Sequence, residues 1–293
     1  MPAERETDHA AIDWITGTVL AALEDGDPIG AVALTFLLRR YTETDGAEIR
    51  DALEPALASA LERHADVETD RDRAAWLTLF VEALALSSDE RIHEAAEALA
   101  ESLRRARGSA LDIRSAACAV DAALRACGVL GTAAAAQDAI DELERLVGAA
   151  YRPGEGLVGG HLVDHIALSS ALLTAFALTG RLPYSMLAEE LIQFARRTGW
   201  SDAAGCFVVA DLDQAEAFLF NCEAARVLCR MAALHGDRDY LATAVIRSDA
   251  AYAADAVRIL DAHGAAFRQF GVQSASYGLA LAEWLALQLE SSR

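Results

Sequence analysis

Two histidines and an aspartate stand close together in the segment "GGHLVDHIALSS", residues 159–170. His161, Asp164 and His165 have i, i+3 and i+4 spacing, so in a helix all three side chains lie on one face. Such residues can bind zinc, and a histidine beside a carboxylate can also transfer protons near neutral pH. A third alternative is structural, with His161 or Asp164 capping a helix and His165 packing on its first turn.

A metal site would need further ligands, and the sequence has neither an HExxH motif nor a second Cys/His pair. The glycines of "GEGLVGG", residues 154–160, follow a predicted helix rather than a strand, so they indicate a loop and not a dinucleotide cradle. We therefore predict no metal and no cofactor.

Two further carboxylates, Asp213 and Glu216, stand where another apolar segment begins. Glycoside hydrolysis needs two carboxyl groups roughly 5 to 10 Å apart. A base at Asp164 or His165 and an acid at Asp213 or Glu216 would meet this need if the fold brings them together. These four residues are our catalytic candidates. Asp213 followed by Glu216 also fits an ordinary helix cap.

Other polar and aromatic residues near predicted helix entrances, or inside apolar helices, are candidates for substrate binding. Each has a structural alternative, since aromatic rings pack in cores and buried polar groups join helices. The candidates are His161, Trp76, Arg114, Asn221, Glu223 and Tyr277.

Helical periodicity runs through the chain, and strand signals are nearly absent. Short segments that contain Gly, Asp and Pro divide the chain into twelve predicted helices. They cover residues 8–24, 28–41, 47–64, 71–86, 89–106, 112–127, 132–150, 161–179, 184–198, 213–235, 238–262 and 272–290. Pro55 is the one internal breaker and predicts a kink or a late helix start.

The predicted helices alternate between two kinds. Those near 28–41, 71–86, 112–127, 161–179, 213–235 and 272–290 are apolar nearly all round, which predicts that protein surrounds them. Their partners have one apolar stripe and one charged face. This predicts an all-α fold, an (α/α)6 toroid of six hairpins in which the first helix pairs with the last, as a single domain over residues 1–293. An open solenoid of helical repeats is the alternative.

The connections that lead into the apolar helices are the long, irregular ones, such as "YRPGEGLVGGH" and "TGWSDAAGCFVVADLD". Long loops on a rigid scaffold commonly carry function. We therefore expect a small-molecule site at the N-termini of the inner helices.

Residues of about 160–245 resemble the six-hairpin glycosidase-like region of thioredoxin-domain-containing proteins of the spermatogenesis-associated protein 20 type. The similar stretches are "VDHIALSSALLTAFALTGRLPYSMLAEELIQFARRTGWSDAAGCFVV" and "FNCEAARVLCRMAALHGDRDYLATA". This chain lacks that family's thioredoxin-like domain with its CxxC, and has Ala204-Gly205 where a double glycine is expected. The resemblance implies the toroid, and its relatives include N-acylglucosamine 2-epimerases, glycoside hydrolases and lyases.

The net charge and composition of the chain limit the classes of partner that it can bind. Among the 293 residues, 45 acidic side chains against 25 basic ones give a formal charge of -20, and every basic residue is arginine. Such a chain repels nucleic acid. It has no stretch of about 18 uncharged apolar residues, so we predict no membrane partner. Five cysteines without a CxxC motif fit reduced thiols in the cytoplasm.

Together these features predict a cytoplasmic, six-hairpin glycosidase-like protein with a carbohydrate-type small-molecule ligand. If the protein is an enzyme, we expect a sugar hydrolase or epimerase. The alternative is a non-catalytic helical scaffold that binds another protein.

Overall fold

A computed structural model describes residues 2–106, 112–131, 133–245 and 250–291. These residues form two compact units. One consists of Met1–Leu53 together with Arg196–Arg293, and the other is Glu54–Ala195. Two helices run across the division, namely α3 (Ala47–Arg63) and α9 (Leu182–Gly199). The single-domain prediction therefore stays a prediction.

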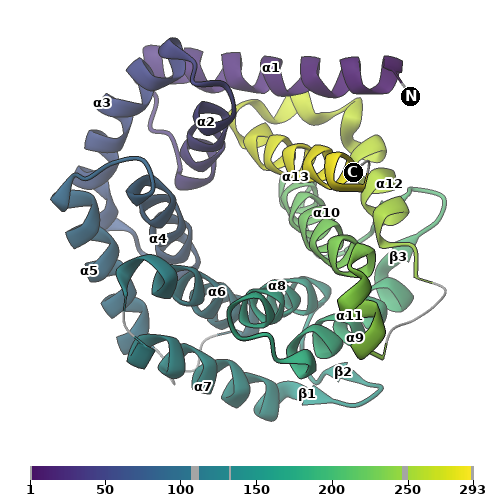
Figure 1. Cartoon of the computed structure of the whole chain (residues 1–293). Helices are drawn as coiled ribbons and strands as arrows, with labels where there is room; N and C mark the ends of the chain where they lie inside the picture. Colours follow the sequence, from purple (N-terminus) through teal and green to yellow (C-terminus); the bar gives the residue numbers. More distant parts are fainter. Residues whose placement is uncertain (1, 107–111, 132, 246–249, 292–293) are drawn as a thin grey trace. The chain divides into compact units, whose positions relative to one another are not determined.

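The middle unit is built from helical hairpins in two layers. Its inner helices are α4 (Asp70–Leu84), α6 (Ile113–Leu130) and α8 (Leu162–Thr179), which pack side by side in that order. Outside them lie α5 (Glu90–Ala106), α7 (Ala133–Ala150) and most of α9 (Figure 1). A single 3₁₀ turn, η1 (His64–Asp66), follows α3.

The terminal unit repeats the two-layer plan with segments from both ends of the chain. Its inner helices are α2 (Ala31–Thr44), α10 (Gln214–Gly236) and α13 (Ala275–Ser291). Its other helical segments include α1 (Pro2–Glu24), α11 (Arg238–Thr243), α12 (Tyr252–Gly264) and the 3₁₀ segment η2 (Phe267–Ser274). Helix α1 packs against α13, so the predicted pairing of the first helix with the last is confirmed.

Several helices begin where a side chain caps the first turn. Thr69, Asp112, Asp213 and Asp237 each accept hydrogen bonds from backbone N–H groups of the helix that they precede. Such bonds satisfy amide donors that have no partner inside a helix. The helix predicted over 238–262 is wrong in extent: α11 ends at Thr243 and α12 begins at Tyr252, and part of the intervening segment lies outside the described residues.

Pro55 does not delay its helix. Helix α3 is continuous from Ala47 to Arg63, so the late start is excluded as an alternative. Proline removes one backbone hydrogen bond from a helix interior. Here the helix lies in the outer layer with much of its surface exposed, and the rest of its hydrogen-bond ladder persists.

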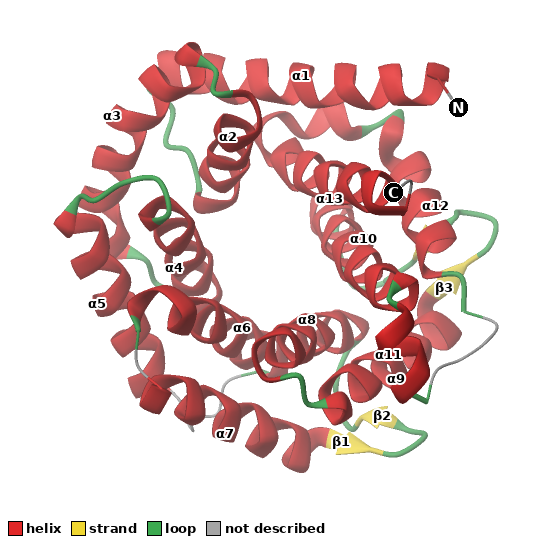
Figure 2. Ribbon diagram, viewed as in Figure 1, coloured by secondary structure: helices red, strands yellow, loops and turns green. Residues whose placement is uncertain are grey.

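Two short hairpins occupy loops that the sequence predicted to be irregular. Strands β1 (Tyr151–Arg152) and β2 (Gly156–Leu157) are antiparallel, as are β3 (Trp200–Ser201) and β4 (Cys206–Phe207) (Figure 2). Gly154 and Gly205 have φ near +80° and +71°, which glycine adopts without strain in such turns. The hairpins fix the chain just before two inner helices begin, α8 and α10.

Helix α8 is long and apolar enough to cross a membrane by composition alone, with a mean hydropathy of 1.6. In this protein 61% of it is buried inside the fold. An inner helix of a two-layer structure has the same composition as a membrane span, because protein surrounds it on most sides. The hydropathy of α8 is thus explained by its place in the core.

Close approach of α2 and α13 depends on a glycine. A Cβ atom at Gly278 would lie 2.5 Å from Cε2 of Phe36, whose ring is completely buried. The absence of a side chain at Gly278 lets the ring of Phe36 lie directly on the backbone of α13.

We expect Gly278→Ala to lower the free energy of unfolding by about 1–3 kcal/mol, because the methyl group overpacks the contact with Phe36. Gly17→Ala is the matched control: Gly17 is an exposed glycine of α1 with open space around it, so alanine there should stabilise by about 0.5–1 kcal/mol. Urea unfolding of both variants measures the difference. Equal stabilities of the two variants would contradict the close-packing argument.

Candidate functional site

The entrance of α8 has the geometry of a helix cap. His161 is the N-cap residue, and its backbone N–H donates to Oδ2 of Asp164 over 2.6 Å. The Asp164 side chain is buried, whereas His161 is exposed. The capping alternative for Asp164 is thus the arrangement that the structure has, and its carboxylate is engaged by the backbone.

His165 is buried and both of its ring nitrogens are engaged. Nε2 accepts the N–H of Leu157 over 3.0 Å, and Nδ1 lies 2.8 Å from the carbonyl oxygen of His161. This pattern requires a neutral ring that carries its proton on Nδ1. The ring also stacks on Phe194 at 4.8 Å between centroids. His165 therefore fastens hairpin β1–β2 to α8, and burial lowers its pKa.

Gly156 completes this contact. Its φ is +73°, and a Cβ atom at this position would lie 2.6 Å from Nε2 of His165 and 2.8 Å from the ring of Phe194. The hairpin can reach the histidine only because residue 156 has no side chain.

Asp213 and Glu216 form a capping box at the start of α10. The N–H of Glu216 donates to Oδ1 of Asp213 over 2.8 Å, and the N–H of Asp213 donates to Oε2 of Glu216 over 3.2 Å. Both residues are exposed. They belong to the terminal unit, whereas Asp164 and His165 belong to the middle unit. Their acid and base roles remain predictions.

Among the predicted substrate-binding residues, Asn221 and Tyr277 have clear structural contacts. The Asn221 side chain accepts from the N–H of Phe207 and donates to its carbonyl oxygen, each over 3.0 Å, which ties β4 to α10. The Tyr277 hydroxyl donates to the carbonyl oxygen of Leu260, and its ring stacks on Phe267.

Besides His161 at the start of α8, the remaining three binding candidates lie on inner helices. Trp76 is buried, with Phe80 beside it and the guanidinium of Arg63 over its ring. Arg114 and Glu223 are half-buried on α6 and α10. Their roles in binding remain predictions.

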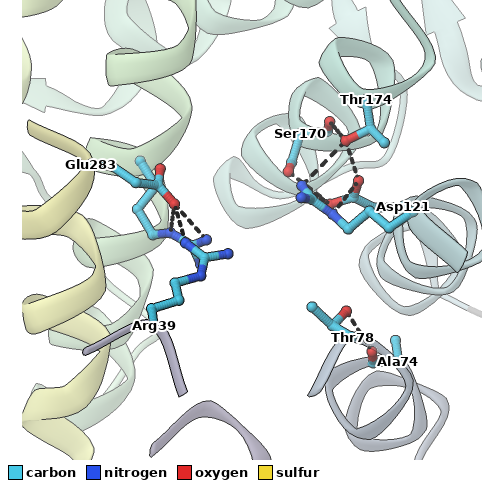
Figure 3. Close-up of polar contacts among 9 residues, drawn as sticks. Arg39, Ala74, Thr78, Asp121, Ser170, Thr174 and Glu283 are labelled. Carbon is cyan, nitrogen blue, oxygen red and sulfur yellow. Dashed lines mark hydrogen bonds and ion pairs between the residues drawn. The ribbon is translucent and has the colours of Figure 1, made fainter. Parts of the chain in front are cut away.

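A polar cluster that residue spacing does not reveal joins α6 to α8 (Figure 3). Asp121 lies in the middle of α6, and both of its oxygens face Arg125 at 3.2 Å. Ser170 of α8 donates to Oδ2 of Asp121 over 2.9 Å, and Thr174 donates to Oδ1. We call these four residues the Asp121 cluster. It combines a carboxylate, a guanidinium and two hydroxyls.

A second polar cluster joins three inner helices of the terminal unit. Glu283 of α13 accepts from Arg39 of α2 over 3.1 Å and from Arg226 of α10 over 2.8 Å (Figure 3). Arg226 and Arg39 hold the pKa of Glu283 below its ordinary value, against the opposing effect of burial. We call Arg39, Arg226 and Glu283 the Glu283 cluster.

Both clusters could be recognised only in part from sequence. Asp121 in "AVDAAL" and Glu283 in "ALAEWLAL" are single acids inside apolar helices, and that isolation is the available signal. The residues predicted to form the site lie mostly at helix entrances instead. Partners as distant in sequence as Arg39 and Glu283 cannot be paired by spacing.

No protein-family model matches this sequence, and none of the curated proteins matches it. Solved structures do match. The unsaturated glucuronyl hydrolase of Bacillus sp. GL1 superposes with a TM-score of 0.69 and 12% identity, over 94% of this chain and 96% of that chain. The α-1,6-mannanase GH76A of Salegentibacter sp. HEL1_6 gives a TM-score of 0.66 and 12% identity, over 94% and 99%.

A third similar structure is the Lin0763 protein of Listeria innocua, with a TM-score of 0.65 and 13% identity over 89% of this chain and 86% of that chain. At such identities the likeness shows the fold. This chain has the all-α (α/α)6 toroid fold that these structures share, so the predicted fold class is confirmed. The finer resemblance to the spermatogenesis-associated type and to the epimerases stays a prediction.

The His165 contacts make stability depend on pH. The unfolded histidine titrates near its ordinary value of 6.5, and the native pKa is lower, so between the two values the unfolded state binds more protons. Stability is then complete above pH 6.5 and falls as the pH falls through that value toward the native pKa. We expect His165→Gln to lose this part of the pH dependence, so that the wild-type advantage in Tm is larger at pH 7.5 than at pH 5.

His93→Gln is the control for removing an imidazole, because the ring of His93 is exposed, and it should lower Tm far less than His165→Gln does at pH 7.5. His263 also has a pKa lowered by burial and contributes to the profile of every variant. The quantity to compare is therefore the difference in Tm between each variant and the wild type at each pH, measured by thermal unfolding. A His165→Gln profile parallel to the wild type would contradict the interpretation.

Proposed function

We propose that this protein binds a carbohydrate-like small molecule and that the Asp121 cluster contributes to the site. The observation that carries this proposal is a half-buried ion pair in the middle of otherwise apolar helices. Asp121 and Arg125 stand on α6 among buried alanines and the buried side chains of Val120 and Leu124. Burying charged groups at these positions costs free energy, whereas apolar residues there would not carry this cost. A ligand-binding role accounts for keeping them.

The chemistry of the cluster suits sugar hydroxyls. A hydroxyl group both donates and accepts, and a carboxylate beside a guanidinium offers one acceptor and one donor at adjacent positions. Ser170 and Thr174 add hydroxyl oxygens on the neighbouring helix, and the Arg125 side chain is 31% exposed. Polar groups placed in this way are what orients a small ligand.

Two of the similar structures support a sugar ligand. One is the mannanase in complex with α-1,6-mannotriose, and another is the unsaturated glucuronyl hydrolase. The inactive mannanase variant has two adjacent aspartates replaced by asparagine. This chain contains no two consecutive aspartates, so the mannanase pair has no direct equivalent in its sequence.

Catalysis is the finer part of the proposal. Hydrolysis or isomerisation of a sugar would use Asp164 or His165 as base and Asp213 or Glu216 as acid. Their observed contacts, which are helix caps and the fastening of a hairpin, favour the non-catalytic alternative for the same residues. We further propose a cytoplasmic location, because none of the five cysteines, all of which the structure describes, forms a disulfide.

The proposal is tested by titrating the protein with α-1,6-mannotriose and with a glucuronyl-terminated oligosaccharide, using calorimetry. Asp121→Asn keeps the size of the side chain but removes its charge, and should weaken binding at least tenfold. Losing a charge-assisted hydrogen bond costs about 1.5–3 kcal/mol, which corresponds to that factor.

Asp141→Asn is the matched control. Asp141 is an exposed carboxylate on α7 that accepts from Gln137 one helical turn away, so its loss should leave binding unchanged. Circular dichroism verifies that both variants fold. If the wild type binds none of the sugars, the proposed function is wrong, and if Asp121→Asn binds as the wild type does, the assignment of the site is wrong.

A further inference from the structure

The Glu283 cluster has more positive than negative charge. Arg39 contacts Glu283 from α2, and Arg226 contacts it from α10 with Nε at 2.8 Å and Nη2 at 2.7 Å. Arg230 lies one helical turn beyond Arg226 and is close enough for its charge to act on Glu283. Three guanidinium groups therefore act on this one carboxylate. The whole chain, by contrast, has a formal charge of -20.

Most other arginine pairs of the protein are local and balanced. Arg145 pairs with Glu142, and Arg91 with Asp89, each within one helical turn and with the arginine exposed. Exposed pairs of this kind contribute little to stability and occur throughout acidic surfaces. The Glu283 cluster instead draws its arginines from two separate helices, α2 and α10, onto a carboxylate of a third, α13.

The two arginines meet the carboxylate unevenly. Both bond to Oε1, whereas Oε2 is buried and has no hydrogen-bond partner among the residues that the structure describes. A single carboxylate oxygen therefore serves as counter-ion to both guanidinium groups.

The charge of Glu283 also acts on a neighbouring thiol. Burial and then the charge of Glu283 raise the pKa of the Cys229 thiol to about 12, which keeps that thiol protonated.

The guanidinium of Arg226 has donor capacity left over. Nε and Nη2 are directed to Glu283, and Nη1 makes no hydrogen bond within the described part of the chain. The side chains of Arg39 and Arg226 are 27% and 30% exposed. Guanidinium groups present five donors in a planar fork that matches the oxygens of carboxylate and phosphate groups.

We propose that Arg39, Arg226 and Arg230 bind an oxyanion group of a small-molecule ligand, a carboxylate or a phosphate, and that Glu283 holds these arginines in place when the ligand is absent. A carboxylate that already accepts from two arginines pre-organises them, which lowers the entropy that binding must overcome. The proposal concerns residues other than the Asp121 cluster, so it stands or falls separately from the proposed sugar site.

The proposal is tested by calorimetric titration at low ionic strength, where screening is weak. The probes are inorganic phosphate, glucuronate, and glucose as the neutral equivalent of glucuronate. We expect phosphate, glucuronate or both to bind, and glucose to bind at least tenfold more weakly than the anion that binds. Binding of phosphate alone identifies a phosphate group, and binding of glucuronate alone identifies a carboxylate.

Two substitutions must change anion binding in opposite directions. Arg226→Gln removes a guanidinium and should weaken binding at least tenfold. Glu283→Gln keeps the shape of the side chain but removes the competing negative charge, and should strengthen binding at least threefold. A purely structural role of Glu283 would not produce tighter binding.

Arg145→Gln is the charge-matched control, because it removes one exposed guanidinium elsewhere and should leave anion binding unchanged. Arg39→Gln provides a second test of weakened binding if Glu283→Gln does not fold, as judged by circular dichroism. The proposal is overturned if the wild type binds neither anion, if glucose binds as well as the anion does, or if Arg226→Gln and Arg145→Gln bind equally well.

Discussion

Enclosure of the inner helices is the constraint on which the rest of the structure depends. A helix that is apolar on nearly every side is stable only where other helices cover most of it, and α4, α6 and α8 pack on one another while outer helices pack on a further side. The layers follow from this requirement. Burying a polar side chain within these layers also costs free energy, because its hydrogen bonds to water must be replaced by hydrogen bonds to other groups of the fold.

That cost explains where polar groups are found. At helix entrances the backbone N–H groups lack partners, so carboxylates such as Asp164 and Asp213 are used there as caps. In the middle of helices the backbone is already paired, and a charged side chain has to be balanced by another side chain. The Asp121 and Glu283 clusters are of this second kind, with guanidinium groups as partners.

The sequence allowed the helices, the two layers and the fold class to be predicted, since each depends on local periodicity and composition. It also identified Asp213 and Glu216 as an alternative cap from their spacing alone. The break after Thr243 and the two hairpins were missed, because such short segments carry too little pattern to outweigh the helices around them. The polar clusters were missed for another reason: their members come from different helices, and contacts between helices have no signature in residue spacing.

The contact between Gly156 and His165 has a consequence beyond this one chain. The imidazole fills the space that any side chain at residue 156 would need, and the backbone conformation there is one that glycine alone adopts easily. The two positions are therefore not free to vary separately over evolutionary time. In related sequences, a histidine at the position of His165 should occur together with a glycine at that of Gly156, and the loss of either one should accompany a hairpin of different length or course.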